Sequence, residues 1–314
     1  VMMKHPARLL TLSTALVAGS IAHAVTRTDF NAYLAASPAP AVRTSSLSRP
    51  VVAPAMVLST DEQRGVPTFL RADLGQMRAP QEARGSAEQA ARWYLAHHAA
   101  RYGVSNDALQ AARILTVHDT GEGGIIVSLR QSVAGIDVFL NDVKVLLTRD
   151  LDLVAISGNP HPSAVPGRVS GRLAFRVAST DALAGAINDL YKVGATGSDM
   201  RDTGQTRNGY HFLSLASESR AGSAGLRLSR PARVKQVFFP MPDRIVPAWF
   251  VEVFSSRGSS ASSDAYAFVV SAVDGRLLFR QNLTQDASFD YRVWADSDTR
   301  PHSGPHADYS PHPT

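Results

Sequence analysis

The sequence predicts an α+β fold made of two similar halves, each a helix packed on an antiparallel β-sheet, with extended segments at both ends. A helical pattern at residues 86–103 precedes alternating apolar and polar residues at 125–157, which is typical of strands with one buried face. The same order, helix and then strands, recurs at 180–194 and 210–280. A helix laid on a sheet buries the apolar face of both, so the repetition indicates two such units.

The first helix has a beginning and an end that the sequence marks. Ser86 is a natural N-cap, and Gln89 three residues later completes a capping box. Gly103 stands where a helix C′ residue is expected. One semi-apolar face follows helical spacing and consists of Ala87, Ala90, Ala91, Tyr94, Leu95, His98 and Tyr102.

Strands and tight turns follow in both halves. In the first half we predict strands at 125–130, 137–148 and 153–157, with turns at 133–136 and 149–152. In the second half a helix begins at Thr180 or Asp181, and Asp274-Gly275 is a two-residue hairpin signal. The strands predicted after that helix span 210–215, 225–228, 234–239, 245–255, 265–272 and 276–280.

Composition sets the broad class. Hydrophobic residues make up 44% of the chain, which indicates a globular protein. The net charge is +5, yet no stretch holds more than two adjacent basic residues, so we expect no nucleic-acid partner. The chain has no cysteine, which excludes disulfides, thiolate metal sites and cysteine catalysis.

Residues 1–24 have the pattern of a secretory signal. Lys4 and Arg8 provide the charged part, and an apolar stretch at 9–22 is too short to span a bilayer. Ala22-His23-Ala24 has the A-x-A form of a cleavage site, so we expect cleavage between Ala24 and Val25. The alternative is a short amphipathic anchor. The signal predicts a secreted, extracellular protein, or one in transit through a periplasm, with no membrane partner after signal removal.

One motif of the first half carries a family resemblance. The segment 135–139, G-I-D-V-F, follows the form G-(I/V)-x-V-(F/Y), and Ser157-Gly158 ends a later strand. In this order of helix, strands and motif the region resembles the FTP/PepSY-like propeptide module of fungalysin- and thermolysin-type zinc metallopeptidases. The resemblance implies a cystatin-like fold for each half.

The second half extends the resemblance. The segments V-P-A-W-F-V-E-V at 246–253, D-A-Y-A-F-V-V-S-A-V-D-G-R-L-L-F-R-Q-N-L-T at 264–284 and F-D-Y-R-V-W-A-D at 289–296 look like the propeptide end and mature start of fungalysin-type peptidases. Together the matched segments of the two halves extend the resemblance over about residues 60–314, which is long enough for two domains. The catalytic signature of that family, His-Glu-x-x-His, is absent from the sequence.

The resemblance implies a domain organisation and a point of cleavage. The expected parts are a signal peptide (1–24), a Pro/Ala/Ser-rich leader (25–67), a first propeptide-like module (68–159), a linker (160–171), a second half (172–285) and a mature start or linker (286–314). The implied maturation junction is Gln285, Asp286, Ala287, Ser288 and Phe289. We expect no cofactor in this chain; the implied zinc belongs to a catalytic domain that this sequence lacks.

Three histidines near the end of the sequence are candidate metal ligands. His302, His306 and His312 form the local cluster, but the prolines at 301, 305 and 311 prevent the helix that would bring two imidazoles to one ion. A solvated linker is therefore favoured over a zinc site. His97 and His98 are adjacent, so we expect one to be packed and the other exposed.

Other candidate groups favour structural roles. Asp137, Asp142, Asp150 and Asp152 lie near turns and lack EF-hand spacing, so turn chemistry is favoured over acid–base work or calcium binding. The glycine run 121–124 precedes a strand and indicates a hairpin loop rather than a phosphate site. Trp249, Phe250, Phe238 and Phe239 are expected in the core, with docking on a protease as the alternative.

Taken together, these patterns predict a pro-region that acts as intramolecular chaperone and inhibitor of a secreted zinc metallopeptidase. The expected partner is the catalytic domain, bound in cis or in trans, and proteolysis would release the pro-region. The alternative is a stand-alone exported protease inhibitor or binding module of the same fold. The sequence shows no catalytic machinery of its own, although the implied parent is a metalloendopeptidase.

Overall fold

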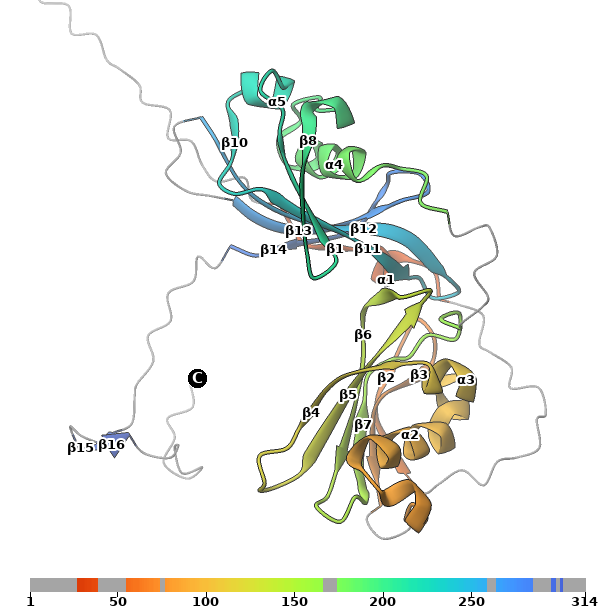
Figure 1. Ribbon diagram of the computed structural model, residues 1–314. Coiled ribbons are helices and arrows are strands. Elements are labelled where there is room, and N and C mark those ends of the chain that lie inside the picture. Colours follow the sequence, from red (N-terminus) through yellow and green to blue (C-terminus); the bar gives the residue numbers. More distant parts are fainter. Residues whose placement is uncertain are drawn as a thin grey trace, which may run out of the picture. The chain divides into compact units, whose positions relative to one another are not determined.

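The chain groups into two compact units, Val1–Leu283 and Thr284–Thr314. In the second unit the described strands are β15 (Ala295–Ser297) and β16 (Arg300–Pro301), which pair antiparallel. The computed structural model (Figure 1) describes residues 27–38, 55–73, 77–165, 174–258, 264–284, 295–297 and 300–301.

The elements follow the chain in two groups. The first group is β1 (Phe30–Asn31), α1 (Ala32–Ala35), β2 (Ala55–Asp61), β3 (Val66–Ala72), η1 (Gln81–Arg84), α2 (Ala87–His98), η2 (Ala99–Tyr102), α3 (Asn106–Gln110), β4 (Arg113–His118), β5 (Ile125–Val133), β6 (Ile136–Leu147) and β7 (Leu153–Ser157). The second group is α4 (Ser179–Tyr191), η3 (Gly197–Asp199), β8 (Met200–Arg207), β9 (Tyr210–Leu215), α5 (Arg220–Ser223), β10 (Leu226–Leu228), β11 (Ala232–Pro240), β12 (Ile245–Arg257), β13 (Asp264–Ser271) and β14 (Leu277–Asn282).

Helix α2 forms where its end signals predict it. The Ser86 hydroxyl accepts a hydrogen bond from the Gln89 backbone N–H at 3.2 Å. A 3₁₀ turn, η2, continues the chain to Gly103, which takes the left-handed conformation with φ 64° and closes the helix. His98 is buried and His97 is exposed, as the sequence predicts.

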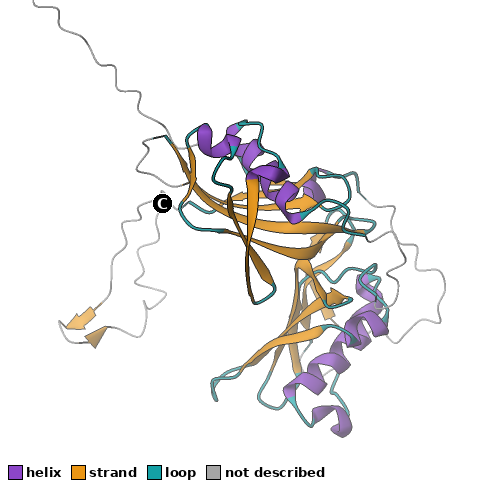
Figure 2. Ribbon diagram, turned by 45° about the horizontal axis from the view of Figure 1, so that its top comes forward, coloured by secondary structure: helices purple, strands orange, loops and turns teal. Residues whose placement is uncertain are grey.

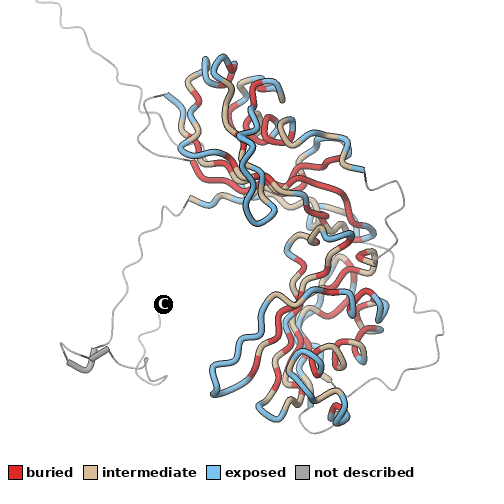
Figure 3. Tube along the Cα trace, in the orientation of Figure 1, coloured by how far each residue is buried: buried red, intermediate tan, exposed pale blue. Residues whose placement is uncertain are grey.

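Helices α2 and α3 cover one face of the strands β4 to β7 (Figure 2). The core beneath them is apolar and continuous, and it appears as the buried stretches of these strands in Figure 3. Tyr94, Leu95 and Tyr102 from the helical side are almost fully buried. They pack on strand residues that include Val127, Leu129, Val143, Val145, Leu147 and Ile156.

Strands β11 to β14 are covered on both faces. Helix α4 packs on one face, against a core that includes Trp249 and Phe268. The other face packs Phe239 and Phe279 against Phe139 of β6. Two-sided cover explains why all eight residues of β13 are buried, as in a central strand rather than one with a solvent face.

The strands of both groups join in one sheet, which corrects the predicted fold class. Val138 of β6 pairs in parallel with Phe238 of β11. Among the described residues a 14-stranded mixed sheet results, with the central order β1-β14-β13-β12-β11-β6-β7-β3-β2. The prediction of an α+β fold of two similar cystatin-like halves, each a helix packed on its own antiparallel sheet, was therefore wrong, because strands predominate and form a single mixed sheet.

A bulge of several extra residues in β6 makes this junction possible. Ser132 pairs with Asp137 and Arg130 with Asp142, so four residues of β6 face a single residue of β5. The extra residues, 138–141, leave the β5 ladder, and one of them pairs with β11 instead. Leu140 in this bulge has φ 49°, a left-handed backbone conformation that is costly for a leucine.

Parts of the segment 25–67 belong to the sheet. Strand β1 pairs with β14, and β2 pairs with β3. Strands β4 and β8, like β1 and β2, lie where the sequence analysis predicted no strand. Among the described residues, no helix is both long and apolar enough to cross a bilayer.

The aromatic contact at the bulge gives a stability prediction. The Phe139 ring centroid lies 5.2 Å from that of Phe279, 5.4 Å from Phe250 and 6.1 Å from Phe239. Because Phe139 is half-buried, we expect Phe139→Ala to lower the free energy of unfolding by about 3 kcal/mol, measured by urea denaturation. Phe69→Ala, at a ring 38% exposed on β3, is the control and should cost clearly less. Equal losses of unfolding free energy in the two variants would show that the Phe139 contacts add no stability at the junction of β6 and β11.

Candidate functional site

Several residues singled out from the sequence lie outside the described residues. These are Ala24 and Val25 of the expected signal cleavage, Gln285, Asp286, Ala287, Ser288 and Phe289 of the expected junction, and His302, His306 and His312.

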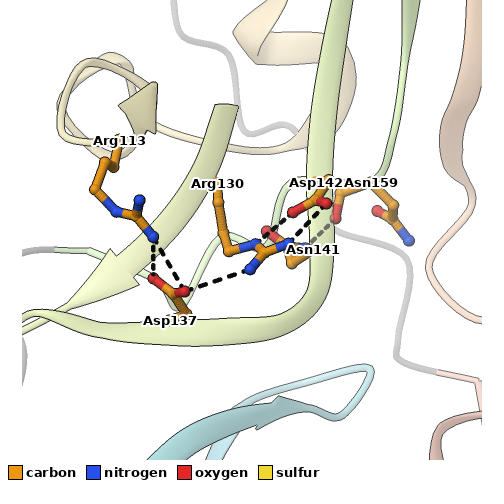
Figure 4. Close-up of polar contacts among 6 residues, drawn as sticks. All are labelled: Arg113, Arg130, Asp137, Asn141, Asp142 and Asn159. Atoms are coloured by element: carbon orange, nitrogen blue, oxygen red, sulfur yellow. Dashed lines mark hydrogen bonds and ion pairs between the residues drawn. The ribbon is translucent and has the colours of Figure 1, made fainter. Parts of the chain in front are cut away.

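Two of the four candidate aspartates come together beside the β6 bulge, in an ion-pair cluster (Figure 4). Arg113 donates to both carboxylate oxygens of Asp137 at 3.0 and 3.1 Å. Arg130 binds Asp142 through two of its nitrogens, one at 2.8 Å, and reaches Asp137 at 3.4 Å. These charge-assisted bonds raise the pKa of Arg130 above its ordinary value, chiefly through the hydrogen bond to Asp142.

This cluster is a structural clamp. Asp137 precedes the bulge and Asp142 follows it, so Arg130 on the neighbouring strand holds both ends. Every carboxylate of the cluster is engaged, which leaves none to serve as a base. The other two aspartates, Asp150 and Asp152, lie in the turn before β7, where Asp152 pairs with Arg78 at 3.2 Å.

On the other side of the bulge lies a cavity of about 150 Å³, which we take as the candidate site. Residues far apart in the sequence line it, and they mix aromatic, amide and cationic side chains. They are Asn31, Tyr33, Arg64, Phe139, Leu140, Asn141, Asn159, His161, Phe239 and Pro240.

Arg64 is the charged group of this cavity and is 8% exposed. Its guanidinium donates to the Asn159 side chain, to the Pro160 carbonyl at 3.0 Å and to the Tyr102 carbonyl at 3.2 Å. These acceptors are all neutral. Burial lowers the pKa of Arg64 from its ordinary value, because desolvation disfavours a charged group.

Asp61 is connected to Arg64 through an amide. The Asn159 side chain donates to the Asp61 carboxylate and accepts from Arg64, and the Tyr33 hydroxyl also donates to that carboxylate. Burial, with the hydrogen bond to Asp61, raises the pKa of Tyr33 above its ordinary value. In the described chain the aspartate and the arginine therefore form no direct ion pair.

His161 is fixed in one tautomer by its partners. Its Nε2 lies 2.7 Å from the Met241 carbonyl, and its Nδ1 accepts from the Ser163 backbone N–H at 3.1 Å. This pattern requires a neutral imidazole with the proton on Nε2. Burial, and then the positive charge of Arg64, lower the pKa of His161 to about 4.

The arrangement suits binding. The His161 nitrogens and the Asp61 carboxylate are all engaged, so neither is poised to move a proton. Within the part of the chain that the structure describes, no group of three or more His, Asp or Glu residues could hold a metal ion. The cavity offers apolar walls, amides and a buried cation to a ligand.

Sequence reasoning missed the residues that line this cavity with polar groups. Arg64, Asn141 and Asn159 sit in unrelated segments, and each is ordinary in its local pattern. One signal was available, because Asn141 directly follows the apolar run V-F-L near the centre of a predicted strand. A polar residue at such a place indicates either a bulge or a site.

The clamp gives a second stability prediction. Arg130→Gln should lower the free energy of unfolding by about 2 kcal/mol, because Asp142 loses its two-pronged bond to Arg130 and Asp137 keeps only Arg113. Arg113→Gln is the matched control and should cost less, since its side chain is 55% exposed. Chemical denaturation measures both, and the reverse order would contradict the clamp.

His161 gives a pH prediction. An unfolded histidine titrates near pH 6.5, whereas the folded His161 titrates at about 4. Between these values the unfolded chain binds the extra proton, so the free energy of unfolding should fall by up to about 3 kcal/mol as the pH drops through this window. Below pH 4 the contribution of His161 should level off.

A variant separates this histidine from the others. His161→Gln should flatten part of the slope, and the remainder should persist because burial also lowers the pKa of His98 to about 4. Unfolding curves recorded at several pH values between 7 and 4 measure the slope. An unchanged slope in His161→Gln would refute the assignment.

Comparison with known proteins yields little. No protein-family model and no curated protein matches the sequence. Among solved structures, the chain is similar to the Bacillus megaterium YpeB C-terminal domain, with 11% identity and a TM-score of 0.27, over 70% of this chain and 74% of that one. This likeness is weak, supports no argument about function, and does not single out the fungalysin family.

Proposed function

We propose that this chain is an exported protein-binding module of the pro-region type, which assists the folding of a secreted zinc metallopeptidase and inhibits it. The observation that carries the proposal is the place of the motif 135–139 in the fold. Gly135 has φ 80° in the turn between β5 and β6, Asp137 is clamped by arginines, and Phe139 packs on the neighbouring strands. The residues that carry the family resemblance are thus those the fold needs at its junction.

The chemistry of the described residues supports binding. A partner that binds the folded state of an enzyme stabilises it only while it remains bound, which is how a pro-region would act. The cavity, lined by both apolar and polar side chains, has the composition of a recognition site. Zinc would belong to the partner.

A second candidate is a stand-alone exported inhibitor or binding module that acts in trans. It is favoured by the division of the chain at Leu283, since the first unit is compact by itself. Such a unit would retain its binding surface after cleavage.

Limited proteolysis tests the pro-region proposal. Strand β14 is paired with both β13 and β1, so its backbone should resist cleavage. We expect the first cut of the intact chain by a non-specific protease to fall within residues 283–298, with a folded N-terminal fragment left. Mass spectrometry locates the cut, and a first cut inside β11–β14 would contradict the proposal.

An inhibition assay tests the partner. The purified chain should inhibit a thermolysin- or fungalysin-type zinc metallopeptidase in a dose-dependent manner, with a serine peptidase on the same substrate as the control. Equal inhibition of both enzymes would indicate competition as a substrate. No inhibition and no binding of the zinc enzymes would overturn the metallopeptidase partner.

A further inference from the structure

Arg64 is a buried cation that the fold compensates only in part. A buried cation is costly unless a charged partner compensates it. Among the described residues no carboxylate lies within ion-pair distance of Arg64; the Asp61 carboxylate attracts it from across the Asn159 amide and so compensates the charge in part. The guanidinium makes three hydrogen bonds, fewer than its N–H groups allow.

The partly compensated charge of Arg64 borders the cavity. Arg64 lines the cavity together with Asn31, whose side-chain oxygen accepts from the Tyr33 backbone N–H at 2.9 Å. The amide NH₂ of Asn31 makes no hydrogen bond that the structure shows, so it is a second donor for a ligand. A cation and an amide donor in one cavity are suited to a carboxylate.

Apolar side chains form part of the remaining wall and limit the size of the ligand. Phe139, Phe239 and Pro240 line the cavity, and Leu140 stands at its rim with 71% of its surface exposed. A cavity of about 150 Å³ is the size that holds a benzene molecule. A leucine-sized or phenyl-sized group therefore fits between these walls.

Leu140 combines exposure with an unfavourable backbone. Its left-handed φ of 49° costs free energy, and its exposed side chain gains little packing in return. Such strain is found at places where a residue meets a ligand. The strained residue of the bulge thus stands at the rim of the cavity.

We propose that this cavity binds a carboxylate that carries a compact apolar group, with Arg64 as the cation that receives the carboxylate. The ligand chemistry is shared by a small aliphatic acid and by the C-terminus of a polypeptide that ends in an apolar residue. The proposal does not depend on a peptidase partner, so it can fail or hold independently of the proposed function.

A pair of matched probes tests the charge. In an NMR titration of the intact chain, 4-methylpentanoate should bind more tightly than 4-methylpentanamide by about tenfold, because the amide lacks the charge that pairs with Arg64. The amide resonances that shift should include Asn31, Leu140 and Asn141. Equal affinity for the two probes, or shifts confined to other parts of the chain, would overturn the proposal.

Two variants test the residues. In Arg64→Met the preference for the acid over the amide should disappear. In Leu140→Asn both probes should bind more weakly by a similar factor, while stability stays the same or rises, because asparagine tolerates the left-handed conformation. If Arg64→Met does not fold, the probe pair and Leu140→Asn decide the matter. Unchanged binding in Leu140→Asn would place the ligand elsewhere.

A peptide distinguishes the two sources of the carboxylate. A short peptide that ends in leucine is compared with the same peptide carrying a C-terminal amide, and with 4-methylpentanoate. Tighter binding of the free-acid peptide than of the small acid identifies a polypeptide C-terminus as the ligand. Equal binding of the two acids identifies a small acid, and a peptide amide that binds as well as its free acid contradicts the role of Arg64.

Discussion

The contact between β6 and β11 is the constraint on which the rest of the structure depends. The bulge at residues 138–141 takes β6 out of register with β5 and presents Val138 to Phe238. Without this pair, each group of strands would end there in an edge with unpaired backbone groups. Arg130 fixes the two flanks of the bulge, and Phe139 fills the space beyond it.

The same bulge builds the cavity. Phe139, Leu140 and Asn141 are consecutive residues of the bulge, and all three line the cavity. The cavity is therefore a by-product of joining the strands, because a strand that leaves one neighbour for another cannot fill all the space between them. Arg64 lies in this space with only neutral acceptors, so the junction also brings an electrostatic cost.

Local features of the fold could be predicted from the sequence. The N-cap of α2 at Ser86, the left-handed Gly103 that ends the following 3₁₀ helix η2, and the hairpin turn before Ile136 are encoded by a few neighbouring residues, and the structure confirms them. The fold class could not be predicted in this way. It depends on one pair, Val138 with Phe238, whose members are far apart in the chain, and periodicity carries no information about such a pair.

The cavity was beyond sequence reasoning for a similar reason. Its polar groups come from Asn31, Arg64, Asn141 and Asn159, which belong to separate segments. The segment before residue 68 has the composition of a leader, which hid the contribution of Asn31 and Arg64. By contrast, the apolar run of β13 predicted a strand correctly. The burial of β13 on both faces could not be predicted, because it depends on the elements that cover the strand.

The pairing of β1 with β14 has a consequence for the order of assembly during synthesis. Arg280 donates to the Thr28 carbonyl, and these residues are 252 positions apart. Because the ribosome synthesises β1 long before β14, β1 has no strand to pair with until nearly all of the described chain has been made. Closing so large a loop is entropically costly and slow. We therefore expect β1 to be the last strand to pair, and the edge of β14 to stay unpaired until β1 adds to it.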